Sequence, residues 1–171
     1  VRIVFMNVGS TWCCDGSFDR KRFDQAFETF ADSPEDLALI VRFTITTPTD
    51  FAQLYPDELA RFSHVPDEQM RNDEYRGGLM HILPEFASFA SPAWRQAGCR
   101  YIDAVIDAVE AHPQSARVVG YMINTGCTGE GILWGHQEGL YGDYSQPAKE
   151  AFRTWLRENY DTDAALRQAW Q

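Results

Sequence analysis

Three short apolar runs divide the chain and predict the strands of one sheet. They cover residues 1–6, 37–45 and 118–123. β-Branched and other apolar side chains fill each run, as is typical of strands. The second run shows almost no alternation between apolar and polar positions, which predicts a strand that is buried on both faces. Such strands belong to parallel sheets that are covered by helices.

Amphipathic segments between the runs predict helices. Apolar residues recur at helical spacing over residues 19–30 and again after Ser91. Ser91 is a favoured N-cap and Pro92 suits the first turn, while His112-Pro113 marks the end of the second helix. Strands that alternate with helices in this way predict β–α–β units with parallel strands, and therefore an α/β fold.

Two more helices are expected after the third run. The longer covers residues 145–160 and begins at Ser145. Thr162 or Asp163 is expected to cap a short last helix that ends near Trp170. The longer helix is expected to have an inner, apolar face made of Ala148, Ala151, Phe152, Trp155 and Leu156.

Composition places the chain among globular proteins. Hydrophobic residues make up 44% and charged residues 23% of 171 positions, which suits a single domain over residues 1–171 with its own core. No apolar run reaches the roughly 20 residues that cross a bilayer, so no membrane partner is expected. The formal net charge of −10 would repel a phosphate backbone, so no nucleic-acid partner is expected either. The sequence indicates no compartment.

The four cysteines do not form a recognisable metal or redox motif. Cys13 and Cys14 are adjacent, and Cys99 is expected to be a small core residue within a helix. Free thiols are the preferred interpretation, since no CxxC occurs. A metal site built from Cys13 or Cys14 with Cys127 and His136 is the alternative, although this spacing matches no standard zinc pattern.

The loop after the third run is the richest in candidate chemistry. It carries Glu130, Trp134 and His136, and it follows the carboxyl end of a strand, where α/β folds bind ligands. Aromatic residues make up 13% of the chain, and a surplus near polar loops would suit a neutral, ring-shaped ligand such as a sugar.

One segment resembles glycoside hydrolase family 42. Residues 151–160 read Ala-Phe-Arg-Thr-Trp-Leu-Arg-Glu-Asn-Tyr and are followed by Ala165-Leu166 and Ala169-Trp170, which is similar to that family's AFRxWLxxxY–ALxxAW signature. Further similarities lie at Thr47-Pro48-Thr49, Tyr55-Pro56, Ser91-Pro92, His112-Pro113, Val118 to Tyr121, Tyr144-Ser145 and Pro147-Ala148.

The resemblance implies part of a (β/α)₈ TIM barrel of a retaining, β-galactosidase-like glycosidase of clan A. Residues 1–171 would hold roughly strands two to four with their helices, as a fragment of the catalytic domain. The implied substrate is a galactoside-like carbohydrate, and no cofactor is required. The nucleophile Glu of this family follows the seventh strand and has no counterpart here, so the isolated chain is expected to be inactive.

The acid/base residue of the resembled family is a Glu that directly follows an Asn after the fourth strand. Here Asn124 is followed by Thr125, and the nearest carboxylate is Glu130. We therefore predict Glu130 as the acid/base, because nearby Ile132 and Trp134 would raise its pKa and keep it protonated. A solvated loop carboxylate is the alternative role of Glu130, and Glu138 is the competing acid.

Other side chains are predicted to bind substrate. Asn124 would hydrogen-bond a sugar hydroxyl, or else only cap the strand end. Arg42, in an otherwise apolar strand, needs a partner if it is buried, either a catalytic carboxylate or an ion pair in the core. Trp12 and Trp134 would stack on a sugar or belong to the core, and His136 is a further polar candidate.

Two other functions stay open, namely non-catalytic carbohydrate binding and a truncated barrel domain that associates with itself as a homo-oligomer.

Overall fold

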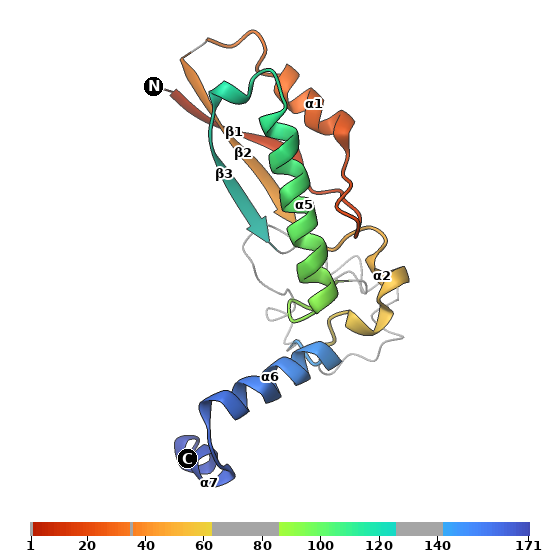
Figure 1. Cartoon of the computed structure of the whole chain (residues 1–171), viewed down its shortest axis with the longest axis vertical. Coiled ribbons are helices and arrows are strands. Elements are labelled where there is room, and N and C mark those ends of the chain that lie inside the picture. The colour runs from red at the N-terminus through yellow and green to blue at the C-terminus, as the bar shows by residue number, and fades with distance from the viewer. Residues whose placement is uncertain (1, 35, 63–85, 126–141) are drawn as a thin grey trace.

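A computed structural model describes residues 2–34, 36–62, 86–125 and 142–171 (Figure 1). Its strands are β1 (Arg2–Gly9), β2 (Leu37–Ile45) and β3 (Val118–Thr125). They form one parallel sheet in the order β1-β2-β3. The parallel α/β arrangement predicted from the apolar runs is confirmed, with β1 and β3 running two or three residues further than expected. These described strands form an open sheet, so the barrel itself stays a prediction.

Helices follow the strands, and all but one of those in the described ranges match helices expected from the sequence. They are α1 (Arg20–Glu28), α2 (Phe51–Leu54), α5 (Pro92–Glu110), α6 (Gln146–Asn159) and α7 (Asp163–Ala169). Two single turns of 3₁₀-helix, η1 (Pro56–Glu58) and η2 (Ser115–Arg117), lie in the connections. None of the helices in the described ranges is long and apolar enough to cross a membrane.

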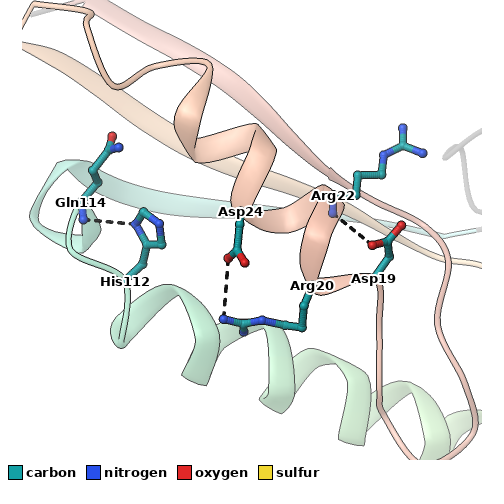
Figure 2. Close-up of polar contacts among 6 residues, drawn as sticks. All are labelled: Asp19, Arg20, Arg22, Asp24, His112 and Gln114. Carbon is teal, nitrogen blue, oxygen red and sulfur yellow. Dashed lines mark hydrogen bonds and ion pairs between the residues drawn. The ribbon is translucent and has the colours of Figure 1, made fainter.

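Side-chain caps fix the starts of four helices. The capping oxygens belong to Asp19, Ser91, Ser145 and Thr162, and each accepts a hydrogen bond from a backbone N–H in the first turn. Thr162, rather than Asp163, is therefore the cap of the last helix. Figure 2 shows the cap of α1, where the backbone N–H of Arg22 donates to Asp19 at 3.0 Å.

The core lies between the sheet and the helices α1 and α5, which cover one face of it (Figure 1). Alternate residues of β1 and β2 point into this core, and Phe23 and Phe27 of α1 meet them. The strand residues are Met6, Val8, Leu39, Val41, Phe43 and Ile45, and α5 contributes Ala97, Tyr101, Val105 and Val109. Every one of these side chains is at most 7% exposed. Apolar burial on this face is therefore what holds the layers together.

The opposite face of the sheet is largely open. Ile3 and Phe5 of β1 are 59% and 57% exposed, and Met122 of β3 is 40% exposed. On β2, Ile40 and Thr44 point this way and are half-buried, whereas Ala38 at the start of the strand is buried. The prediction that β2 is buried on both faces is therefore wrong for the described structure, because helices cover one face only.

The expected inner face of α6 does not pack on the sheet. Phe152 and Trp155 are 48% and 44% exposed, and no residue of α6 is buried. Figure 1 shows α6 and α7 leading away from the sheet. Their aromatic side chains contact each other instead, with the Nε1–H of Trp170 donating to the Tyr160 hydroxyl at 3.0 Å. Cys99 is likewise exposed on α5, so its assignment to the core was wrong.

Candidate active site at the carboxyl ends of the strands

The strand register brings Arg42 and Asn124 together near the carboxyl ends of β2 and β3. Arg42 pairs with Asn7 on one side and with Met122 on the other, and Asn124 pairs with Thr44, two residues beyond Arg42. Residues two apart on a strand share a face. All of these side chains therefore belong to the face of the sheet that α1 and α5 do not cover.

A two-point hydrogen bond joins the two predicted binding residues. The guanidinium of Arg42 donates from Nε at 2.8 Å and from Nη2 at 3.0 Å to the side-chain oxygen of Asn124. The oxygen, and not the NH₂ group, must face Arg42, because a guanidinium has donors only. Asn124 is 6% exposed and Arg42 is half-buried. The partner that Arg42 required is thus an amide, and no carboxylate bonds to it within the described ranges.

Trp12 lies elsewhere, in the core under the helices. It is 1% exposed, and its ring stacks on Tyr101 of α5 with centroids 4.8 Å apart and an interplanar angle of 7°. Its indole Nε1–H donates to the Thr46 hydroxyl at 3.2 Å. The structure therefore does not bring Trp12 together with Arg42 and Asn124. Its environment fits the alternative, a core residue that joins the loop after β1 to the loop after β2.

The adjacent cysteines differ in their environments. Cys13 is half-buried, with its sulfur 3.3 Å from the Thr49 hydroxyl oxygen. Cys14 is buried, and its backbone N–H donates to Asp50 at 2.8 Å. Burial, followed by the hydrogen bond and charge of Asp50, raises the pKa of Cys14 to about 12 and keeps its thiol protonated. No group of three metal-ligating side chains occurs in the parts of the chain that the structure describes.

Several predicted site residues fall outside the described ranges. These are Glu130, Trp134, His136, Cys127 and the competing acid Glu138. β3 ends at Thr125, the residue after Asn124, so all of them follow this strand in the sequence. Their proposed roles stay predictions, as does the metal site that would use Cys127 and His136.

A groove that the sequence did not predict lies between η1, the start of α5 and α6. Its volume is about 560 Å³. The Trp155 indole and the charged residues Asp57, Glu58, Arg95, Glu150 and Glu158 line it. The sequence signal that could have indicated this groove was Trp155, which we instead assigned to the inner, apolar face of its helix. This groove is lined by none of the predicted site residues.

Comparison with known protein families gives a match over most of the chain. Residues 13–171 match the model of glycoside hydrolase family 42, which is described as beta-galactosidase. The chain belongs to this family. Membership of family 42 confirms the resemblance seen at residues 151–170, and it makes the chain a glycoside hydrolase-like domain with a carbohydrate as the expected ligand. Comparison with curated proteins and with solved structures gave no significant match.

Proposed function

We propose that this family 42 chain supplies the acid/base half of a retaining, β-galactosidase-like active site, as part of a (β/α)₈ barrel. The observation that carries the proposal is the Arg42–Asn124 pair at the carboxyl ends of β2 and β3. The pair lies on the uncovered face of the sheet, and Asn124 lies six positions before Glu130 in the sequence. Ligands of α/β proteins bind at this end of the strands.

The chemistry requires two carboxyl groups about 5–5.5 Å apart, one acting as acid and then base, the other as nucleophile. In the proposal, Glu130 donates a proton to the glycosidic oxygen as the bond to the leaving group breaks. A Glu from a later strand of the complete barrel attacks the anomeric carbon. Asn124 binds a sugar hydroxyl, and Trp134 and His136 line the sugar. No cofactor takes part.

Glu130→Gln, with Glu138→Gln as the matched control, tests the proposal when both are made in the complete barrel, which includes the nucleophile. Aryl β-galactosides with a poor leaving group (phenyl) and a good one (2,4-dinitrophenyl) are compared, because only the poor one needs a proton from the acid. Loss of general acid catalysis lowers rates by about 10²- to 10⁴-fold. We expect that loss for the phenyl substrate in Glu130→Gln and a much smaller loss in Glu138→Gln. Unchanged turnover in Glu130→Gln would remove Glu130 from the mechanism.

A second candidate function is carbohydrate binding without turnover. Thr125 favours it, since this residue occupies the position directly after Asn124 where the resembled family has its acid/base Glu. Titration of the chain with methyl β-galactoside in a calorimeter distinguishes the two. Saturable binding with no hydrolysis of either aryl galactoside, when the complete barrel is assayed, would support the binding function over the enzymatic one.

A further inference from the structure

Two segments from the connections that follow β2 and β3 meet shortly before α6 begins. The backbone N–H of Tyr144 donates to the carbonyl oxygen of Arg61 at 2.8 Å, and Phe62 forms an antiparallel bridge with Gly142. The approach is so close that a Cβ at Gly142 would lie 2.7 Å from the Phe62 ring. The two connections are therefore joined backbone to backbone at this point.

The carboxylate of Asp143 adds three hydrogen bonds to the junction. Its Oδ1 accepts from the backbone N–H of Arg61 at 2.9 Å and from that of Ser145 at 2.8 Å. Its Oδ2 accepts from the Ser145 hydroxyl at 2.9 Å, and the hydroxyl oxygen accepts in turn from the Ala148 N–H as the cap of α6. Hydrogen bonds to an ionised acceptor are roughly twice as strong as neutral ones. Together with the bridge, we call these contacts the Asp143 clamp.

The clamp holds one end of the segment that carries the proposed acid/base. Residues 126–141, which include Glu130, lie between Thr125 and Gly142 in the sequence. Thr125 pairs with Ile45 in the sheet, and Gly142 belongs to the clamp. Fixing both ends of a segment leaves it fewer conformations than fixing one end only. Loss of the Asp143 carboxylate therefore loosens the second of these ends and leaves the first in the sheet.

We propose that Asp143 is a positioning residue for the acid/base step. It fixes the chain at Gly142 against the connection after β2, and so restricts where the preceding segment places its carboxylate. This proposal rests on the proposed function, in which Glu130 protonates the glycosidic oxygen. Asp143 acts through the backbone and needs no sugar contact of its own.

The first experiment needs no ligand and uses the 171-residue chain. Hydrogen exchange of the Arg61 N–H is followed by NMR, with amides in the middle of α5 as the internal reference for folding. We expect this N–H to exchange about tenfold faster or more in Asp143→Ala, while the reference amides stay unchanged. Asp143→Asn keeps one oxygen that can accept from Arg61, so it should fall between the two.

The matched control is Asp161→Ala. Asp161 is exposed after α6 and accepts no hydrogen bond within the described ranges, so its loss should not change the exchange of the Arg61 N–H. If the Arg61 N–H exchanges equally fast in the wild type, Asp143→Ala and Asp143→Asn, the clamp and the proposal are both overturned, whatever the protein binds.

The second experiment measures kcat/KM in the complete barrel for phenyl and 2,4-dinitrophenyl β-galactosides. A misplaced acid slows only the substrate that needs its proton, and a small displacement of a catalytic group can cost about 10²-fold. We expect Asp143→Ala to lower kcat/KM for the phenyl substrate about tenfold or more and to change the dinitrophenyl substrate little. A merely structural role would lower both by the same factor, because less of the enzyme would be folded. Asp143→Asn should recover part of the phenyl rate, and Asp161→Ala should match the wild type.

The outcomes separate the two proposals. If Glu130→Gln slows the phenyl substrate selectively but Asp143→Ala slows both substrates equally or neither, the positioning role is overturned and the proposed function stands. If Glu130→Gln leaves both substrates unchanged, the proposed function fails and the catalytic role of Asp143 fails with it, even where the Arg61 N–H depends on the Asp143 carboxylate.

Discussion

Replacing Arg117 by Met tests how the amino end of the sheet is held. Arg117 ends η2, directly before β3, and its guanidinium makes five hydrogen bonds. Three of them reach the connection from α1 to β2 and a fourth reaches Leu37, the first residue of β2, so one side chain joins η2 to this connection and to β2. The acceptors are Ser33 Oγ at 2.7 Å, the Phe30 carbonyl at 2.9 Å, Gln114 Oε1 at 3.1 Å, and the Leu37 and Pro34 carbonyls at 3.3 Å.

The expected loss follows from the two shortest of these bonds. Arg117 is half-buried, so water replaces part of what the substitution removes. A net hydrogen bond is worth about 0.5–1.5 kcal/mol, and more where the donor is charged. Taking roughly 1–1.5 kcal/mol for each of the two short bonds gives about 2–3 kcal/mol of unfolding free energy. For a domain of this size that corresponds to a fall in Tm of roughly 4–12 °C.

Urea unfolding followed by circular dichroism measures this loss. Arg117→Lys keeps the charge but loses the planar fork, so it should fall between the wild type and Arg117→Met. Arg153→Met is the matched control, since Arg153 is exposed on α6 and has no hydrogen bond within the described ranges. If Arg117→Met lies within about 0.5 kcal/mol of Arg153→Met, the reasoning from these five contacts is refuted.

Three further predictions concern other parts of the chain. Burial is the main cause that holds the pKa of His112 below its usual value, so the unfolded chain binds the proton at a higher pH than the folded chain does. The free energy of unfolding should therefore fall as pH drops through about 6.5. His112→Gln should flatten that part of a curve of unfolding free energy against pH, and an unchanged slope would contradict the prediction. Gly16→Ala should lower the free energy of unfolding, measured by thermal melts, by about 1 kcal/mol or more, because Gly16 has φ +92° and a Cβ there would lie 2.9 Å from the Arg100 carbonyl oxygen. Gly120→Ala is the control and should be nearly neutral, because a Cβ at Gly120 would have no atom within 4 Å. If the uncovered sheet face drives self-association, Phe5→Asp, at a side chain that is 57% exposed, should reduce a concentration-dependent mass measured by light scattering; a wild type that stays monomeric at all concentrations would exclude that route.

Local signals explain what could be predicted of the helices and strands. Ser91, Ser145 and Thr162 cap their helices because a short side-chain oxygen satisfies the first free N–H groups, and this depends on a few neighbouring residues only. The apolar run of residues 37–45 became β2 with the same bounds. Its lack of alternation predicted the parallel pairing correctly but the burial of its second face wrongly, since burial depends on which other elements cover the strand.

In the candidate site, too, local signals identified the residues, and long-range contacts decided their partners. Sequence alone identified Arg42 as a residue that needs a partner if it is buried and Asn124 as a candidate for binding a sugar hydroxyl, and the family signature indicated sugar chemistry. That they are each other's partners depends on the pairing of β2 with β3, between residues 82 positions apart, and no local pattern specifies it. Trp12 shows the converse, since the sequence left open a sugar-binding or a core role and the stacking on Tyr101 places it in the core.

By itself, then, the sequence determined the order of the elements, their caps, the parallel sheet and the family, because each depends on short-range propensity or on a contiguous motif. Only the tertiary structure decided which face of the sheet is covered, that the aromatic face of α6 is exposed, and that the Asn124 oxygen faces Arg42. Those features depend on the register of distant strands and on the packing of layers, in which the environment of each side chain is set by residues far away along the chain.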